Sequence, residues 1–296
     1  MKALVGIPVY NEEANISKLL DILMSGLPRS VAKVLVISSG STDKTNQIVG
    51  SYRRRFPIIN LLVEEERRGK VSAMNLILRE AEEFDAAVCL GGDNLPGDQA
   101  VGAVLNELER GNAGIVGTRP VPLNSTDNFV GWCVHELWNL HHLISLKSPK
   151  ISGELFAFRP GVVREIPPGL INDDSYLQVL FEMRGFQSVY LPDAKVYLMG
   201  PRTVGDFSRQ RRRIFVGHAQ IEILVGKKIP TFRWVRNLKL VGKAKPTRGL
   251  KSLLYGVGFL GLVGIDWLLS NWDLLRLNFP YKWKISSTTK SLRYGI

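Results

Sequence analysis

The first 120 residues alternate short β-branched and aliphatic runs with stretches of helical periodicity. Strands that are separated by helices of about a dozen residues form a mostly parallel sheet, because each crossover helix packs on one face of it. Asn11 is expected to cap the first helix, with Glu12 in its first turn. The expected fold class is α/β, with helices on both faces of the sheet. The strands are expected at residues 4–9, 34–37, 58–63 and 86–90, and the helices at 12–24, 43–54 and 71–83.

The pattern becomes less regular after residue 120, and no internal repeat appears. We expect one domain over residues 1–225, followed by a basic, apolar segment over residues 226–296 that associates with a membrane. The expected elements of the later part are an aromatic-rich helix at 129–146, a strand at 155–158, a helix at 175–184, two short strands within 188–198 around Pro192, and an arginine-rich helix at 205–225.

The positive charge of the chain is concentrated in its last third. Residues 1–199 carry a formal charge of −3, whereas residues 200–296 carry +15. This asymmetry indicates an anionic partner, and the candidates are a phospholipid surface, a nucleic acid and a phosphorylated substrate. Nucleic acid is not expected, because the aromatic residues lie mostly in apolar runs and not among the cations. Cys89 and Cys133 lack the spacing of a disulfide framework or a zinc ribbon, so a reducing, cytosolic setting is the default.

An apolar run near the C-terminus suggests contact with a membrane. The 14 uncharged residues between Lys251 and Asp266 would span about 21 Å as a helix, short of the roughly 30 Å hydrocarbon core. A longer span would place Asp266 inside the bilayer. We therefore expect an interfacial or re-entrant helix at the cytoplasmic membrane face, with Trp267 and Trp272 at headgroup level. A buried helix of a soluble domain is the alternative.

Polar residues follow four of the expected strands, at Pro8–Asn11, Ser38–Ser41, Arg67–Lys70 and Gly91–Asn94. Ligands of open α/β sheets bind where such strand-end loops meet. Cations and backbone amides bind phosphate oxygens, and a carboxylate binds Mg²⁺ or Mn²⁺. The loops together indicate a site for a nucleoside diphosphate with a divalent cation.

Five motifs in order give the chain a resemblance to a known family. They are Pro8 to Glu12, Gly40 to Asp43, Gly69-Lys70 with Asn75, Asp93, and the acidic Asn172-Asp173-Asp174, and Gln210 to Ile214 follows in place of a Q-x-x-R-W motif. This set resembles glycosyltransferase family 2, which has the GT-A fold, and its membrane-linked members. The resemblance implies transfer of a sugar from a nucleotide sugar to an acceptor hydroxyl, with inversion at the anomeric carbon.

The resemblance also implies roles for individual residues. Asp93 is the expected metal ligand, and Asp174 is the expected general base with Asp173 beside it. Adjacent carboxylates are expected to raise each other's proton affinity, which suits a base. The residues expected to bind the donor and its diphosphate are Pro8, Tyr10, Asn11, Glu12, Ser39, Lys70, Gln210 and Arg213.

Three positions depart from the family pattern. Gly91-Gly92-Asp93 keeps only the last aspartate of the usual D-x-D, so metal dependence is expected in weakened form. Ser38-Ser39 replaces an acidic pair that reads the nucleobase, so the donor is left open between UDP and GDP. Ile214 replaces a tryptophan, which favours single transfer over processive synthesis.

Two other classes of function remain open. A nucleotidyltransferase would have a similar α/β body, although Pro8 to Asn11 is not its glycine-rich loop. A catalytically degenerate member would act as a basic, lipid-binding adaptor. The expected partners of the enzyme are a nucleotide sugar, a lipid-linked or glycan acceptor, and an anionic membrane surface.

Overall fold

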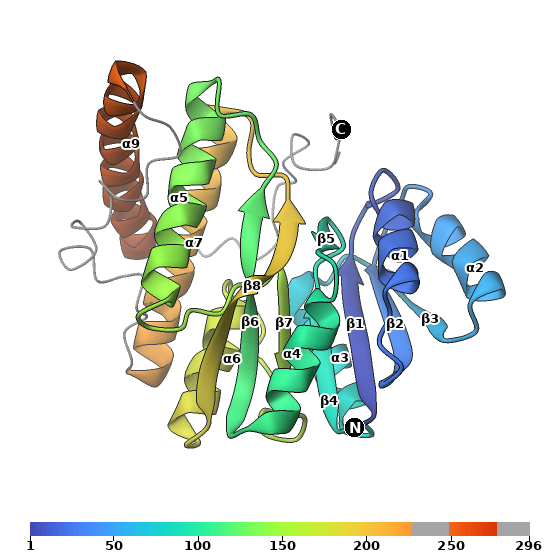
Figure 1. Cartoon of the computed structure of the whole chain (residues 1–296). Coiled ribbons are helices and arrows are strands. Elements are labelled where there is room, and N and C mark those ends of the chain that lie inside the picture. Colours follow the sequence, from blue (N-terminus) through green and yellow to red (C-terminus); the bar gives the residue numbers. More distant parts are fainter. Residues whose placement is uncertain (227–248, 277–296) are drawn as a thin grey trace.

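The computed structural model describes residues 1–226 and 249–276, which form an eight-stranded sheet with flanking helices (Figure 1). Four strands, β1 (Ala3–Val9), β2 (Val31–Ser39), β3 (Ile59–Glu64) and β4 (Ala86–Leu90), are mutually parallel where they pair. The aliphatic residues of β1, β2 and β4 are mostly buried on both faces, as expected for parallel strands, whereas the edge strand β3 is partly exposed. The predicted α/β class is therefore confirmed.

The second half of the sheet is mixed. The full strand order is β3-β2-β1-β4-β7-β6-β8-β5. Strand β7 (Leu155–Phe158) is antiparallel to β4 and to β6 (Ala113–Pro122), β6 is parallel to β8 (Gln187–Leu198), and β5 (Asn94–Pro96) is antiparallel to β8.

Two hydrophobic cores lie on opposite faces of the sheet. The alternate side chains of β1 divide between them: Val5 and Ile7 enter the core with helices α1 (Ile16–Ser25) and α4 (Ala100–Arg110), and Leu4 enters the other. Helix α2 (Thr45–Arg55) also packs on the first face, through Val49. Helices α3 (Lys70–Ala81) and α6 (Asp173–Met183) cover the second face.

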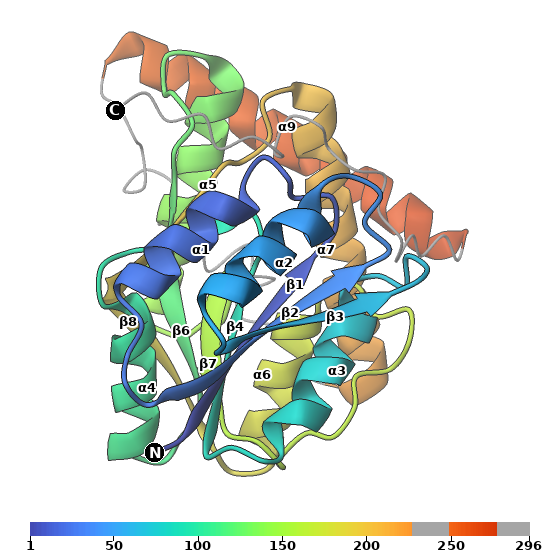
Figure 2. The ribbon, with the colours of Figure 1, turned by 90° about the vertical axis from the view of Figure 1, so that its right-hand side faces the viewer.

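A separate group of three helices lies beside the sheet. Helices α5 (Phe129–Ser145), α7 (Val204–Val225) and α9 (Leu250–Leu275) enclose a third, aromatic core that includes Trp132, Phe207 and Phe259. Figure 2 shows α9 lying across the end of the molecule toward which β1 runs. These helices therefore stand at the carboxyl ends of the parallel strands.

Several local predictions are corrected by the structure. Asn11 does not cap the first helix, which begins only at Ile16 after Asn15. Asn11 instead has a left-handed backbone with φ of 51°, and its carboxamide exchanges hydrogen bonds with Thr42. Residues 188–198 belong to one strand, not two. A shift of register in that strand, between the pairs Leu191–Thr118 and Lys195–Arg119, occurs where the break was expected at Pro192.

The C-terminal apolar helix is longer than its uncharged run. Helix α9 has 26 residues, a length of about 39 Å, and by length and mean hydropathy it is the one helix of the described residues that could cross a membrane. Asp266 lies on its inner face, fully buried, and accepts a hydrogen bond from Ser208 of α7. The aspartate therefore faces the protein body. The boundary expected between residues 225 and 226 remains a prediction, and residues 227–248 and 277–296 of the expected membrane-associated segment lie outside the described residues.

Candidate active site at the strand ends

A cavity of about 540 Å³ opens where the parallel strands end. Loops from β1, β2 and β4 line one side of it, and α5, α6, α7 and α9 line the other. It gathers ten of the predicted site residues: Pro8, Tyr10, Glu12, Ser39, Lys70, Asp93, Asp173, Asp174, Gln210 and Arg213. Asn11 does not line it. Residues that are far apart in the chain therefore meet in a single crevice.

The loops that follow β1 and β2 form one end of the cavity, and the ring of Tyr10 lies there. The Arg67 guanidinium lies 4.3 Å from the centroid of the Tyr10 ring. The Ser39 hydroxyl accepts hydrogen bonds from the backbone N–H groups of Arg68 and Gly69, at 3.0 and 3.3 Å. Ser39 therefore holds the basic loop against β2, and its hydroxyl proton is left to donate. Glu12 is buried and accepts a hydrogen bond from Asn15.

Asp93 lies in the tight turn between β4 and β5. A Cβ atom on Gly91 would lie 2.2 Å from Nδ2 of Asn94, and one on Gly92 would lie 2.6 Å from Cγ1 of Val9. The Asn94 carboxamide thus fills the space of a side chain at position 91. This packing gives a physical reason for the missing first aspartate of the D-x-D pattern.

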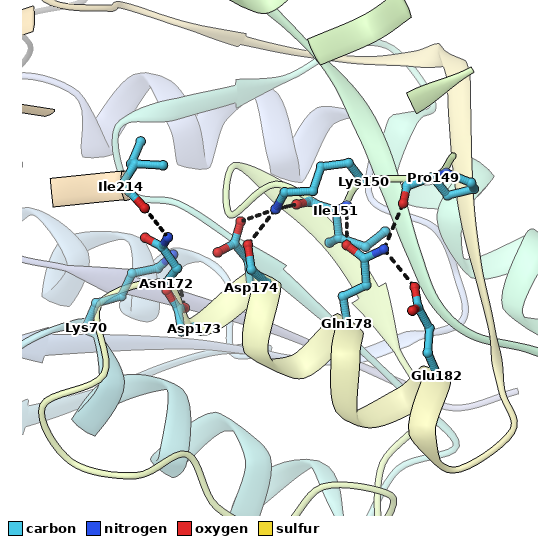
Figure 3. Close-up of polar contacts among 11 residues, drawn as sticks. Lys70, Pro149, Lys150, Ile151, Asn172, Asp173, Asp174, Gln178, Glu182 and Ile214 are labelled. Carbon is cyan, nitrogen blue, oxygen red and sulfur yellow. Dashed lines mark hydrogen bonds and ion pairs between the residues drawn. The ribbon is translucent and has the colours of Figure 1, made fainter. Parts of the chain in front are cut away.

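The acidic pair opens α6 and meets two lysines (Figure 3). The Lys70 ammonium lies 3.1 Å from Oδ2 of Asp173, and the Lys150 ammonium lies 4.0 Å from Oδ2 of Asp174. Burial by itself would lower the pKa of Lys70, but the neighbouring negative charges, with that of Asp173 foremost, together outweigh burial and raise it. Lys70, which was expected to bind the diphosphate, is thus already paired with Asp173.

The expectation that the two carboxylates would raise each other's proton affinity is wrong for Asp174. Burial raises the pKa of its carboxyl, but the charges of Lys150 and Lys70 outweigh burial and lower it below the usual value. Opposite charges at this range favour the ionised form. Asp174 is therefore a carboxylate near neutral pH.

Helix α7 brings Gln210 and Arg213 to the cavity, one turn apart on the same face. The Asn172 carboxamide donates to the carbonyl oxygen of Ile214 at 3.0 Å, which ties the start of α6 to α7 (Figure 3). A Cβ atom on Gly217 would lie 2.6 Å from Asn172, so glycine permits this close approach. The acidic pair and Arg213 are thus held in fixed relation.

Several cavity residues were not predicted from the sequence. They are His141, Lys150, Glu154, Arg211 and His218. Burial, together with the Asp174 charge, raises the pKa of Glu154 to about 7, and its Oε2 is buried without a hydrogen-bond partner among the described residues. Glu154 directly precedes β7, and this position at the end of a strand was its one sequence signal.

The residues of the cavity fit a divalent cation that arrives with its substrate. Mg²⁺ and Mn²⁺ prefer oxygen ligands, and Mg²⁺ commonly takes one or two carboxylates together with substrate phosphates and water. Asp93 supplies such a carboxylate at the strand ends. Over residues 1–226 and 249–276, no group of three or more His, Cys, Asp or Glu side chains forms a complete protein cage.

Relatives of the chain cover it only in part. Glycosyltransferase AglE of Haloferax volcanii is 35% identical over 113 residues, which are 38% of this chain and 34% of AglE. Poly-beta-1,6-N-acetyl-D-glucosamine synthase of Staphylococcus aureus is 24% identical over 223 residues, which cover 69% of this chain and 51% of the synthase. The chain thus spans about half or less of the length of these relatives.

Solved structures share the fold. The mannosyltransferase PcManGT from Pyrobaculum calidifontis, in complex with GDP-Man and Mn²⁺, matches with a TM-score of 0.61 and 24% identity, over 95% of this chain and 82% of that one. S. aureus TarS 1–349, in complex with UDP-GlcNAc, matches with a TM-score of 0.51 and 16% identity, over 97% and 95% of the two chains. The expected GT-A architecture is thereby confirmed.

Two family models match the sequence itself. The model described as glycosyl transferase family 2 matches residues 4–156, just over half of the chain. The model described as glycosyl transferase family group 2 matches residues 88–279. The first match covers the loops that carry Pro8, Lys70 and Asp93, and the second covers the acidic pair and α7. The chain therefore belongs to glycosyl transferase family 2.

Proposed function

We propose that the protein is an inverting glycosyltransferase that moves a sugar from a nucleoside diphosphate to an acceptor hydroxyl. The observation that carries this proposal is the meeting of Asp93 and Asp174 in one cavity at the strand ends, among Lys70, Arg213 and Gln210. Membership of the family supports it, as do the GDP-Man and UDP-GlcNAc bound by the two structural neighbours. Because those donors differ in their base, UDP and GDP both remain candidates.

The reaction assigns a distinct task to each side of the cavity. As the acceptor oxygen bonds to the anomeric carbon, the bond from that carbon to the diphosphate breaks and the diphosphate leaves with the electron pair. Arg213 and Gln210 stabilise the negative charge that gathers on the leaving group, with Lys70 nearby. A divalent cation held by Asp93 would supply further electrostatic stabilisation. The donor's base would lie beside Tyr10 and Ser39, with Pro8 and Glu12 shaping that end.

Asp174 accepts the proton of the attacking hydroxyl. Inversion requires the acceptor to attack from the face opposite the diphosphate, so its base must stand across the cavity from the cation site. Asp174 comes from the start of α6, whereas Asp93 comes from the turn after β4. The lowered pKa of Asp174 keeps the carboxylate in the form that can receive a proton.

We further propose that the acceptor is lipid-linked and that the protein works at the cytoplasmic face of a membrane. One end of the cavity is apolar, with Leu137, Trp138, Phe259 and Val263 in its wall. Nearby, α9 exposes large apolar side chains while it buries Ser252, Asp266 and Ser270. An exposed surface made of large apolar side chains suits an apolar medium. The exposed side chains include Leu250, Leu253, Leu254, Val257, Ile265, Leu268, Trp272 and Leu275.

The contacts of α9 agree better with a helix that lies at the membrane interface than with one that crosses the membrane. Asp266 is hydrogen-bonded to Ser208, and Asp273 pairs with Arg212 at 2.7 Å, so α9 is tied to α7 at two points nearly two turns apart. A helix fixed along the body in this way presents its outer side to a membrane surface. The basic residues of the last third would add attraction to anionic lipid.

A donor screen tests the proposal directly. UDP- and GDP-sugars are offered with Mg²⁺ or Mn²⁺ and a membrane lipid extract, and nucleoside diphosphate release is measured together with sugar transfer to lipid. We expect one donor class to be used, with loss of turnover in Asp93→Ala and unchanged turnover in Asp193→Asn, an exposed control. Absence of turnover with every donor, together with intact vesicle binding, would instead favour the lipid-binding adaptor.

A further inference from the structure

Four nitrogen-bearing side chains form a compact group on the cavity wall opposite the nucleotide loops. They are His141 of α5, Lys150, and Arg211 and His218 of α7, which we call the cationic wall. Lys150 is only 5% exposed, and its ammonium donates to the Ile151 carbonyl and the Ser175 hydroxyl. Figure 3 shows Lys150 reaching toward Asp174. None of these four residues has a role in the reaction proposed above.

Polar atoms of this wall lack partners within the described part of the chain. Both ring nitrogens of His141 are buried without a hydrogen bond, and so is Nε of Arg211. Buried polar groups in proteins are almost always hydrogen-bonded, to protein, to water or to a ligand. Three such atoms in one cavity are therefore candidates to contact a ligand or ordered water.

The charges of the wall are also poorly balanced. The ion pair of Lys150 with Asp174 is long, at 4.0 Å, and Glu154, with its pKa raised to about 7, is half protonated near neutral pH. Burial first, and then the neighbouring Lys150, lower the pKa of both His141 and His218 to about 3. Two imidazoles are thus kept neutral, mainly by burial and further by the positive charge of Lys150. An anion bound here would lower the free-energy cost of protonating the two imidazoles.

The wall adjoins the apolar end of the cavity. The ring of Trp138 lies 5.3 Å from that of His141, and the guanidinium of Arg211 lies 5.9 Å from the Phe207 ring, which in turn contacts Phe259 of α9. The wall also reaches Asp174 through Lys150. It therefore occupies the space between the reacting centre and the hydrophobic surface.

We propose that the cationic wall is a binding site for a phosphate group of the acceptor. The inference rests on the proposed function and deepens it, because it states the chemistry of the acceptor: an anionic phosphate beside an apolar chain. Arg211 and Lys150 donate charge-assisted hydrogen bonds to phosphate oxygens. His141 and His218 supply further donors once the bound anion allows them to take up protons. The donor diphosphate is held separately, by the strand-end loops and by Gln210 and Arg213.

Titration calorimetry with simple amphiphiles tests the site on the full-length protein in detergent. The probes are decyl phosphate, decanol and inorganic phosphate. Decyl phosphate should bind about tenfold or more tightly than decanol, as expected when one charge-assisted hydrogen bond is added. Similar binding of decanol and decyl phosphate would overturn the proposal. Inorganic phosphate that binds as tightly as decyl phosphate would support the phosphate site and assign it to a soluble acceptor.

Variants connect the binding to the wall. Arg211→Gln and Lys150→Gln should each weaken decyl phosphate binding about tenfold, Arg211→Lys should retain most of it, and Lys147→Gln, an exposed lysine of the same segment, should leave it unchanged. Unchanged affinity in both glutamine variants would refute the assignment. If both fail to fold, histidine NMR of the unmodified protein decides: decyl phosphate should raise the pKa of His218, identified by His218→Gln, and an unmoved resonance would refute it.

The same preparations separate this proposal from the proposed function. Donor binding is measured in parallel, with Asp93→Ala as the variant that should lose it. If donor turnover persists while decyl phosphate fails to bind, the phosphate site is wrong and the transferase stands. If decyl phosphate binds but no nucleotide sugar does, the transferase assignment fails alone.

Discussion

The strand-end cavity and helix α9 place their polar side chains in opposite ways. Around the sheet, aliphatic residues are buried, and Ser39, Asp93 and Asp174 stand where a ligand can reach them. In α9, Asp266 and Ser270 face inward, while residues such as Leu254, 63% exposed, face outward. Apolar surface is costly in water, so the two regions suit different surroundings. The cavity agrees with the proposed charged donor, and the exposed face of α9 agrees with the proposed position at a membrane.

The largest expected effect concerns the aqueous side of this comparison. Asp174→Asn removes the proton acceptor but keeps the shape of the side chain. Turnover should fall by about 10²- to 10⁴-fold, the range typical of general base catalysis, while the donor still binds. Initial rates and donor titration of the same preparation check this. Turnover within a factor of a few of the original would mean that another group takes the proton, and Glu154 would be the first candidate.

The next effect concerns the outer face of α9. Leu254→Glu combined with Leu268→Glu places two charges on side chains that are 63% and 61% exposed. Binding to anionic vesicles should fall by an order of magnitude or more, because charged groups resist transfer to the interface, while the melting temperature stays within a few degrees. Flotation with vesicles and a thermal melt measure the two quantities. A matched pair, Glu107→Gln and Glu109→Gln on α4, should float as the unmodified protein does.

The inner face of α9 should respond in the opposite manner. Phe259 is 1% exposed and packs against Trp132 and Phe207. Phe259→Ala should lower the free energy of unfolding by about 3–5 kcal/mol, through lost burial and the cavity left behind. Denaturant unfolding of the detergent-solubilised protein gives this value. An unaltered stability would mean that α9 does not pack on α7 in solution, and the contrast between its two faces would be lost.

The smallest expected effect concerns how Glu154, in the polar cavity, makes stability depend on pH. Glu154 has a folded-state pKa of about 7, raised from its ordinary value of 4.5, so the unfolded chain releases this proton first as pH rises. The native state therefore loses stability between about pH 4.5 and 7, and the full loss is present above that window. Glu154→Gln should gain about 3 kcal/mol relative to the original at pH 8 and nothing at pH 4. Melting curves across pH measure the difference, and a gain that is independent of pH would contradict the raised pKa.

The parallel half of the sheet was predictable because its strands consist mostly of aliphatic residues. β4 and β7 were predicted at the residues where they occur. β6 was not, because its sequence contains two glycines, an arginine and two prolines and looks like a loop. It forms a strand because β7 and β8 pair with it on both sides. Helix α4 was absent from the expected elements although Val101, Val104 and Leu105 have helical spacing.

The residues of the candidate site also include some that the sequence predicts and others that it does not. Ser39, Lys70 and Asp93 follow strands, and the edge of a parallel sheet brings such positions together whatever the loops do. The cationic wall depends instead on how α5 and α7 pack, which the sequence does not state. Lys150 follows Ser148 and Pro149 and looks like part of a solvated turn. The same packing lowers the pKa of Asp174, although the sequence showed only two adjacent acids.

The Asn94 side chain restricts which residues the protein can accept at position 91. Its amide fills the volume that any side chain at position 91 would need, at a separation of 2.2 Å from the ideal Cβ. An aspartate cannot return at position 91 while Asn94 keeps this conformation. The two positions form a coupled pair, so a lineage that regained the first acid of the motif would need the Asn94 side chain to move aside or to be replaced by a smaller one.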